Sequence, residues 1–305
     1  MDQAAVLRQM KNKGKETKPA AAMVPQGSRT ARESDKERIR VISITSGKGG
    51  VGKTHIAANL ACIFSGMRKK TLILDADMGL ANIDVVLGLA PHFNLHHVLT
   101  GEKKLRDVLV RGPGDVVILP AASGVQEMAN LSAGQKLTLL DELNGIDEGF
   151  DFMLIDTAAG IAGNVMYFNM AAKEIIVVVS PEPTSLTDAY ALIKILYQGH
   201  DEKRIMVIVN MARSASEARE VYKKLSKATE HFLDLSIEYL GYILHDEKVT
   251  EAVKQQKALV RLYPNCQASK CLSAIAEKMC SEKPSNYNYG SIKFFSKAIM
   301  DRNCG

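Results

Sequence analysis

The sequence lacks the features that would mark a secreted, disulfide-bonded or membrane-spanning protein. It has no run of eighteen apolar residues, and its first apolar stretch is interrupted by Arg8 and followed by Lys11, Lys13 and Lys15, unlike a secretory leader. Its five cysteines are odd in number and include no Cys-x-x-Cys pair, which excludes a disulfide framework and the usual zinc spacing. A formal net charge of +5 selects no anionic partner. We therefore expect a cytosolic protein with at most a peripheral membrane contact.

Short apolar runs alternate with helical patterns from Ile39 onward. Six of these runs resemble strands buried on both faces, and the segments between them are long enough for crossover helices. The runs are RVISIT, TLILD, DVVILP, FMLID, EIIVVVS and RIMVIVN, and helices are expected over 54–66, 132–145, 185–199 and 214–231. Repeated βα units predict an α/β fold with a doubly wound, mostly parallel sheet and helices on both faces. Its ligand should lie at the C-terminal ends of the strands.

Composition divides the chain into four parts. Residues 1–10 can form a short N-terminal helix, 11–38 have the composition of a flexible tether, and 39–283 make up the α/β domain. Residues 284–305 contain a stretch, 291–303, that can be drawn as an amphipathic helix. Its apolar arc includes Ile292, Phe294, Phe295 and Ile299, opposed by Lys293 and Lys297. On periodicity alone, packing onto the core is the commoner outcome, and a membrane-surface helix is the alternative.

A phosphate-binding loop follows the first predicted strand. Residues 46–54 read SGKGGVGKT and match G-x-x-x-x-G-K-[ST] from Gly47, directly before a predicted helix. In such a loop backbone N–H groups close around the phosphates, Lys53 reaches the β and γ phosphates, and the Thr54 hydroxyl ligates magnesium. The predicted ATP-binding residues here are Gly47, Lys48, Gly49, Gly50, Val51, Gly52, Lys53, Thr54 and His55.

Two further strands end in acids that suit phosphoryl transfer. Asp75 ends the apolar run TLILD, and Asp77 lies two residues further on. Asp156 ends the run FMLID, and Gly160 after it can act as a hinge. All three acids should meet the phosphates at the same sheet edge, and Asp156 should hold Mg²⁺ through water. An aspartate pair that merely caps a helix is the alternative for Asp75 and Asp77.

A second lysine in the loop points to a dimer. Lys48 cannot easily reach its own phosphates once Lys53 occupies them, but it could reach the nucleotide of a facing subunit and neutralise transition-state charge there. Dimerisation would then be part of catalysis.

The motif KGGVGKT is identical to the deviant Walker A signature of the MinD/ParA ATPases, and about residues 39–279 resemble that family. The resemblance implies an Mg²⁺-dependent, dimerisation-activated enzyme that converts ATP and water to ADP and phosphate. It assigns catalysis to Lys48, Lys53 and Asp77, magnesium to Thr54, Asp75 and Asp156, and nucleotide contacts to Asn82, Asn210 and Asp246. By the same resemblance Asp77 orients the attacking water. Many relatives have a proline where this chain has Leu244-His245, which weakens the assignment of Asp246.

Several branches of that family do not fit this sequence. Iron–sulfur carriers and nitrogenase-type reductases need suitably placed cysteines, and none lies between Cys62 and Cys266. The tyrosine-rich tail of the related kinases is reduced here to Tyr287 and Tyr289. Division-site, DNA-partitioning and flagellar-number ATPases remain.

Both ends of the chain resemble the flagellar-number branch, FlhG or FleN. The opening DQAAVLR is similar to the FlhG activation helix, which implies stimulation of the signal-recognition-particle-type GTPase FlhF, and SPEPTSLTDAY also resembles FlhG. The residues of that helix that would contact FlhF are Asp2, Gln3, Leu7 and Arg8. Residues 290–303, with their KFF core, resemble the FlhG membrane-targeting helix, which changes our interpretation of this segment to a membrane contact.

We therefore expect an ATP-switched homodimer that is cytoplasmic and binds reversibly to anionic lipid on the cytoplasmic face of the cell membrane. Its expected partners are a second copy and FlhF, with flagellar C-ring proteins and a flagellar transcription activator as further candidates. Nonspecific DNA binding is not expected. The alternatives are a division-site ATPase, a partitioning ATPase that binds DNA with steep salt dependence, and a protein scaffold without useful ATPase activity.

Overall fold

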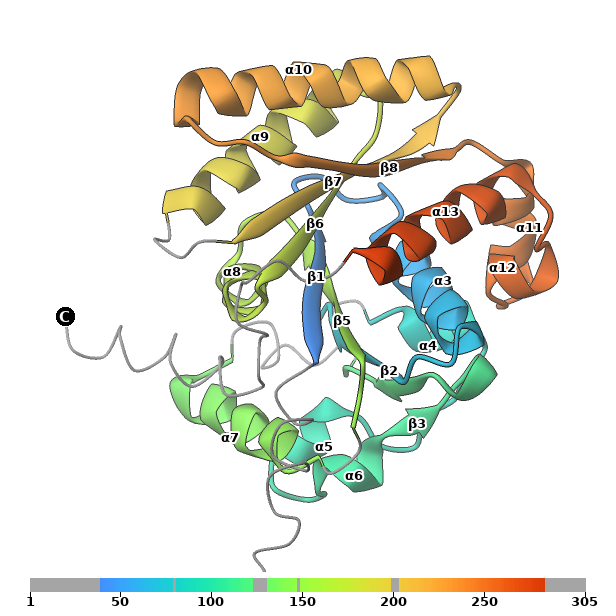
Figure 1. Ribbon diagram of the computed structural model, residues 1–305. Helices are drawn as coiled ribbons and strands as arrows, with labels where there is room; N and C mark the ends of the chain where they lie inside the picture. Colours follow the sequence, from blue (N-terminus) through green and yellow to red (C-terminus); the bar gives the residue numbers. More distant parts are fainter. Residues whose placement is uncertain (1–38, 79–80, 123–130, 147–148, 199–202, 283–305) are drawn as a thin grey trace, which may run out of the picture. The chain divides into compact units, whose positions relative to one another are not determined.

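The computed structural model describes residues 39–282, except 79–80, 123–130, 147–148 and 199–202. Their strands form one sheet in the order β3-β4-β2-β5-β1-β6-β7-β8 (Figure 1). The short strand β3 runs antiparallel to β4, and the other pairs are parallel. The strands are β1 (Arg40–Ser46), β2 (Thr71–Ala76), β3 (Val110–Arg111), β4 (Val117–Leu119), β5 (Phe152–Ala159), β6 (Glu174–Val179), β7 (Arg204–Ala212) and β8 (Glu238–Leu244).

Helices cover both faces of this sheet (Figure 1). One face packs against α3 (Lys53–Gly66), α4 (Ile83–Leu87), α11 (Glu247–Lys254), α12 (Leu259–Leu262) and α13 (Gln267–Ser281). The other packs against α5 (Leu95–Leu99), α6 (Leu105–Val108), α7 (Ala133–Asn144), α8 (Gly163–Ala171), α9 (Pro183–Gln198) and α10 (Ala215–Leu233). A 3-10 turn, η1 (Pro113–Asp115), precedes β4. Because both faces are covered, the strands read as continuous apolar runs, and the predicted doubly wound α/β fold is confirmed.

The central helix α3 shows how the sequence sets this arrangement. It begins directly after Gly52 and is buried on most sides, with Ile56, Ala57 and Leu60 almost fully shielded from solvent. Its buried alanines, Ala57, Ala58 and Ala61, allow the helix to pack closely on the sheet. Since β1 ends at Ser46 and α3 begins at Lys53, the loop 47–52 lies at the C-terminal ends of the strands.

Two strands differ from the sequence-based expectation. β8 was not among the predicted strands because, as an edge strand, its segment EYLGYIL is only partly buried and contains no continuous apolar run. β3 is too short to give a pattern. The run DVVILP forms a strand only over Val117–Leu119, and Asn210, expected at the end of its strand, lies two residues before the end of β7.

The predicted N-terminal helix, the tether and the C-terminal amphipathic segment lie outside the described residues. The assigned positions that fall there are Asp2, Gln3, Leu7, Arg8, Ile292, Lys293, Phe294, Phe295, Lys297 and Ile299. Within the described part of the chain, no helix has both the length and the apolarity that crossing a membrane requires.

A network of ion pairs joins the N-terminal ends of neighbouring strands. Arg40 of β1 donates to both carboxylate oxygens of Glu174 on β6, at 2.8 and 2.6 Å. Arg204 of β7 donates to Glu174 at 3.2 Å, to Glu238 of β8 at 2.8 and 2.6 Å, and to Glu282. These pairs join four neighbouring strand starts and the residue that follows α13.

Candidate nucleotide site

The loop between β1 and α3 depends on glycine at two positions. Gly52 has a φ of 92°, and a Cβ placed on it would lie 2.5 Å from the side-chain nitrogen Nδ2 of Asn210. A Cβ on Gly47 would lie 2.3 Å from the backbone carbonyl of Asp188. The loop is therefore pressed against α9 on one side and against the end of β7 on the other, and larger residues at these positions would displace it.

The lysine of the motif is buried and held beneath the loop. Lys53 is 8% exposed, and its Nζ donates to Ser46 Oγ at 3.0 Å. Burial lowers the pKa of Lys53, while Asp156 and Asp77 raise it. Burial also lowers the pKa of the neighbouring His55, which favours the uncharged imidazole. The amine that should meet the phosphates thus lies close to Asp156 of β5 and to Asp77, which directly follows β2.

Two buried acids, Asp75 and Asp156, lie side by side in the interior. They occupy opposite positions in the pairing of β2 with β5, and each is 1% exposed. Burial raises the pKa of Asp156 to about 7. The Thr54 hydroxyl, which donates to this carboxylate, and the charge of Lys53 act in the opposite direction and lower the pKa. Burial and the charge of Asp156 raise the pKa of Asp75. Two adjacent carboxylates buried in this way are short of positive charge.

One oxygen of this carboxylate pair also lacks a hydrogen bond. Oδ1 of Asp156 has no hydrogen-bond partner in the described structure, although the atom is buried. A divalent cation would satisfy this atom, and oxygen ligands with a threonine hydroxyl suit Mg²⁺. The side chains predicted to hold magnesium, Thr54, Asp75 and Asp156, therefore lie together, and their chemistry fits the ion.

Asp75 also organises the loop that follows β2. Its Oδ1 accepts from the backbone N–H of Asp77 at 3.1 Å, and its Oδ2 accepts from those of Asn82 and Ile83 at 3.1 and 3.2 Å. Asn82 is the N-cap residue of α4. Asp75 therefore caps the start of α4 in this structure. Its role toward magnesium and the roles of Asp77 and Asn82 toward nucleotide stay predictions.

Lys48 is bound within its own chain. Its Nζ contacts the carboxylate of Glu182 and donates to Thr184 Oγ1 at 3.2 Å, beside the start of α9. Its side chain is 37% exposed. The sequence reasoning noted the segment around Glu182 only for its resemblance to FlhG and did not foresee this contact. The predicted reach of Lys48 to a facing subunit stays a prediction.

The predicted base-side residues are Asn210 and Asp246. Asn210 Nδ2 donates to the Val51 carbonyl at 2.8 Å, so this amide supports the loop directly. Asp246 is the N-cap of α11 and accepts from the backbone N–H of Lys248 at 3.0 Å and of Ala268 at 3.2 Å. Burial raises the pKa of Asp246, but these bonds, together with hydrogen bonds from Cys266 and Gln267, outweigh burial and leave the pKa lowered. Both carboxylate oxygens of Asp246 are thus used within the fold.

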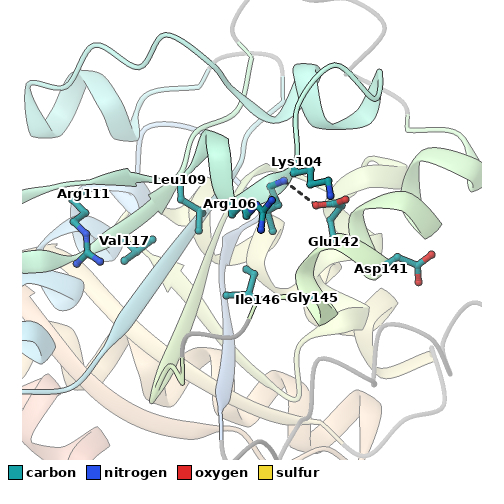
Figure 2. Close-up of a pocket in the computed structure, with 10 residues that line it drawn as sticks. Lys104, Arg106, Leu109, Arg111, Val117, Asp141, Glu142, Gly145 and Ile146 are labelled. Atoms are coloured by element: carbon teal, nitrogen blue, oxygen red, sulfur yellow. Dashed lines mark hydrogen bonds between the residues drawn. The ribbon is translucent and has the colours of Figure 1, made fainter.

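A separate hollow of about 520 Å³ lies near the β3 edge, between α6 and α7 (Figure 2). Leu105, Leu109, Val117 and Ile146 supply its apolar lining, and Arg106 also lines it. Glu142, at its rim, accepts from the backbone N–H of Leu105 at 2.8 Å. None of the predicted nucleotide residues lines this hollow, so we place the chemistry at the loop between β1 and α3.

Comparison with known proteins identifies the family to which the chain belongs. A family model described as an AAA domain matches residues 39–208. The chain is 45% identical over 263 residues to the antiactivator FleN of Pseudomonas aeruginosa, covering 86% of this chain and 94% of FleN. It is 34% identical to the flagellum site-determining protein YlxH of Helicobacter pylori, covering 81% and 84%.

Among solved structures, the septum site-determining protein MinD of Pyrococcus horikoshii, complexed with Mg-ADP, superposes with a TM-score of 0.67. That alignment covers 80% of this chain and 96% of MinD at 27% identity. The sheet order and the phosphate-binding loop define the class as a P-loop ATPase. More particularly, the chain belongs to the MinD/ParA-type ATPases and is similar to FleN.

Proposed function

We propose that this protein is an Mg²⁺-dependent, ATP-hydrolysing switch that dimerises with ATP and regulates the number and placement of flagella. The observation that carries the flagellar role is the similarity to FleN over 94% of that protein, together with the similarity to YlxH, a flagellum site-determining protein. The buried, cation-deficient pair Asp75 and Asp156 beside Lys53 supports the ATPase activity. We place the protein in the cytoplasm and, reversibly, on the cytoplasmic face of the cell membrane.

The residues divide the work of phosphoryl transfer. Loop N–H groups and Lys53 hold the phosphates, while Thr54, Asp75 and Asp156 position Mg²⁺, which neutralises charge that develops on the transferred phosphoryl group. Asp77 orients the attacking water. Its electrostatic influence on both Lys53 and Asp156 supports this role.

Dimerisation completes the site. In a face-to-face dimer Lys48 leaves Glu182 and Thr184 and neutralises charge on the partner's nucleotide. The amphipathic segment at 291–303 binds anionic lipid weakly in one copy, and two segments in one dimer gain through effective concentration. Hydrolysis reverses both steps, so residence on the membrane reports the nucleotide state.

The partners follow from the two ends of the chain and from the relatives. Asp2, Gln3, Leu7 and Arg8 contact and stimulate FlhF. The name antiactivator for FleN supports a flagellar transcription activator as a further partner, and flagellar C-ring proteins remain candidates.

The test is deletion of the gene in its host, with flagella counted per cell by electron microscopy. A raised count or a scrambled pattern, restored by the wild-type gene and not by a Lys53→Ala gene, supports the proposal. Normal flagella with misplaced septa would instead favour a division-site function, the one named for the MinD relative of Synechocystis, which is 34% identical. Lost replicons would favour DNA partitioning.

A biochemical test separates a switch from a passive scaffold. Phosphate release by the purified full-length protein is measured with and without anionic vesicles, and dimerisation is followed by size-exclusion chromatography. We expect Lys48→Ala to abolish the ATP-dependent dimer while leaving nucleotide binding by the monomer largely intact. A dimer that persists in this variant would contradict the role of Lys48 in the partner's site.

A further inference from the structure

Strand β7 departs from regular geometry at Asn210 and Met211. Its pairing with β8 shifts register between Val209 and Ala212. Met211 has a φ of 59°, in the left-handed region that non-glycine residues rarely occupy. Successive side chains of a regular strand point to opposite faces of the sheet, and this break removes that constraint.

Both side chains at the break reach the phosphate-binding loop. Asn210 Nδ2 donates to the Val51 carbonyl at 2.8 Å, and the Met211 methyl carbon lies 3.9 Å from the position of a Cβ built on Gly52. Asn210 Oδ1 in turn accepts from the Met211 backbone N–H at 2.9 Å. The amide of Asn210 therefore fixes the unusual conformation that brings Met211 to the loop.

The resulting position of Met211 is unfavourable unless something covers it. The residue is 41% exposed and belongs to none of the hydrophobic clusters formed by the described residues. A strained backbone that presents an apolar side chain to solvent costs stability twice, and strain of this kind is retained mainly at functional sites. We therefore asked which part of a bound nucleotide could cover the side chain.

The layout of the sheet indicates which part. The carboxylates of β2 and β5, Asp75 and Asp156, lie on one side of β1, whereas β6 and β7 lie on the other. The phosphates bind at the loop between β1 and α3, and the terminal phosphate with its Mg²⁺ must approach the carboxylates. The nucleoside therefore extends in the opposite direction, toward the end of β7 and Met211.

We propose that Met211 packs its thioether against one face of the purine ring of the bound nucleotide and so contributes to nucleotide affinity. A flexible thioether packs favourably on an aromatic ring, whereas phosphate or Mg²⁺ would gain nothing from it. The proposal rests on the proposed nucleotide-binding function and adds a base-recognition residue to it. Met211 acts in binding and takes no part in the transfer of the phosphoryl group.

The experiment compares a ligand that has a base with one that lacks it. The full-length protein is titrated calorimetrically with MgADP and with Mg-tripolyphosphate, in the wild type and in Met211→Ala, Met211→Leu and Met211→Gly. We expect Met211→Ala to weaken MgADP about tenfold and to leave tripolyphosphate within about twofold. Met211→Leu, which keeps an apolar side chain of similar size, should retain most of the MgADP affinity.

Met211→Gly separates a binding role from a structural one. Glycine adopts a φ of 59° without strain, so the nucleotide-free variant should melt at or above the wild-type temperature. It should nevertheless bind MgADP as weakly as Met211→Ala does. A residue that only shaped the strand would not combine unchanged stability with lost affinity.

The outcomes distinguish the two proposals. A wild-type protein that binds neither MgADP nor Mg-tripolyphosphate would overturn the nucleotide-binding function itself. A wild type that binds MgADP, with Met211→Ala unchanged in affinity, would overturn the role of Met211 alone. Equal weakening of both ligands would also overturn it, because Met211 would then act on the phosphate loop.

Discussion

The acids at the two ends of the strands are compensated in opposite ways. At the N-terminal ends Glu174 and Glu238 are matched by Arg40 and Arg204, and the hydrogen bond from Arg204 lowers the pKa of Glu238. Toward the C-terminal ends burial raises the pKa of Asp156 to about 7, and Oδ1 of Asp156 has no partner in the described structure. The first set of acids is paired with cations, and the second keeps a buried carboxylate oxygen without a partner. Ion pairs thus join the N-terminal ends of β1, β6, β7 and β8, whereas the uncompensated acids lie toward the C-terminal ends of β2 and β5.

The largest expected effect comes from removing the acid that lacks a partner. Asp156→Asn should reduce Mg²⁺-dependent ATP hydrolysis about 100-fold, because it removes charge that positions the ion. The same change should stabilise the nucleotide-free protein at pH 8, since it removes an uncompensated buried charge. Phosphate release and thermal melting measure the two effects. Lower stability of the variant at pH 8 would contradict the difference between the two sets of acids.

The matching change at the N-terminal ends of the strands should have the reverse effect. Glu174→Gln leaves Arg40 and Arg204 without their shared carboxylate, and we expect a loss of about 2 kcal/mol in the free energy of unfolding. Hydrolysis per folded molecule should be unchanged. Urea denaturation measures the loss, and Lys69→Ala, which removes an exposed ion pair with Asp151, is the control expected to change stability by less than about 0.5 kcal/mol.

The pH dependence of stability separates the two sets of acids further. In the unfolded chain Asp156 has an ordinary pKa, near 3.8, and in the folded protein about 7. The folded state therefore binds more protons between these values, so the contribution of Asp156 is fully present below pH 4 and is lost as the pH rises through 7. In the absence of Mg²⁺, the wild type should lose stability relative to Asp156→Asn over this range, by up to about 4 kcal/mol. Parallel stability profiles would show that Asp156 titrates normally.

Sequence reasoning anticipated that these residues lie together because its signals are local. The glycines and Lys53 form one contiguous motif, and Asp75 and Asp156 each end an apolar run, which placed them at one sheet edge before the strand order was known. Their direct opposition required the pairing of β2 with β5, which the sequence does not specify.

The ion-pair network could not be foreseen for the same reason. Arg40 and Glu174 are 134 residues apart, and neither lies in a pattern that distinguishes it from a solvated strand end. The same holds for Lys48 and Glu182, also 134 residues apart. The left-handed backbone of Met211 has no signal in its residue type, because methionine has no preference for that conformation.

The smallest expected effect concerns the exposed ion pair between Lys48 and Glu182. Glu182 and Lys48 are 59% and 37% exposed, so their ion pair is screened by solvent and contributes at most about 1 kcal/mol. Glu182→Gln should therefore leave monomer stability nearly unchanged. If the contact competes with a facing nucleotide for Lys48, its loss should tighten the ATP-dependent dimer about two- to fivefold.

Sedimentation equilibrium with a non-hydrolysable ATP analogue measures this change. Glu230→Gln is the matched control, because Glu230 on α10 bonds only its helix neighbour Ser226 among the contacts described for it. An unchanged dimer affinity in Glu182→Gln would mean that the contact does not restrain Lys48. A weaker dimer would place Glu182 itself in the interface. A tighter dimer would make Glu182 an exchangeable partner, which occupies Lys48 until a second subunit offers a stronger anion.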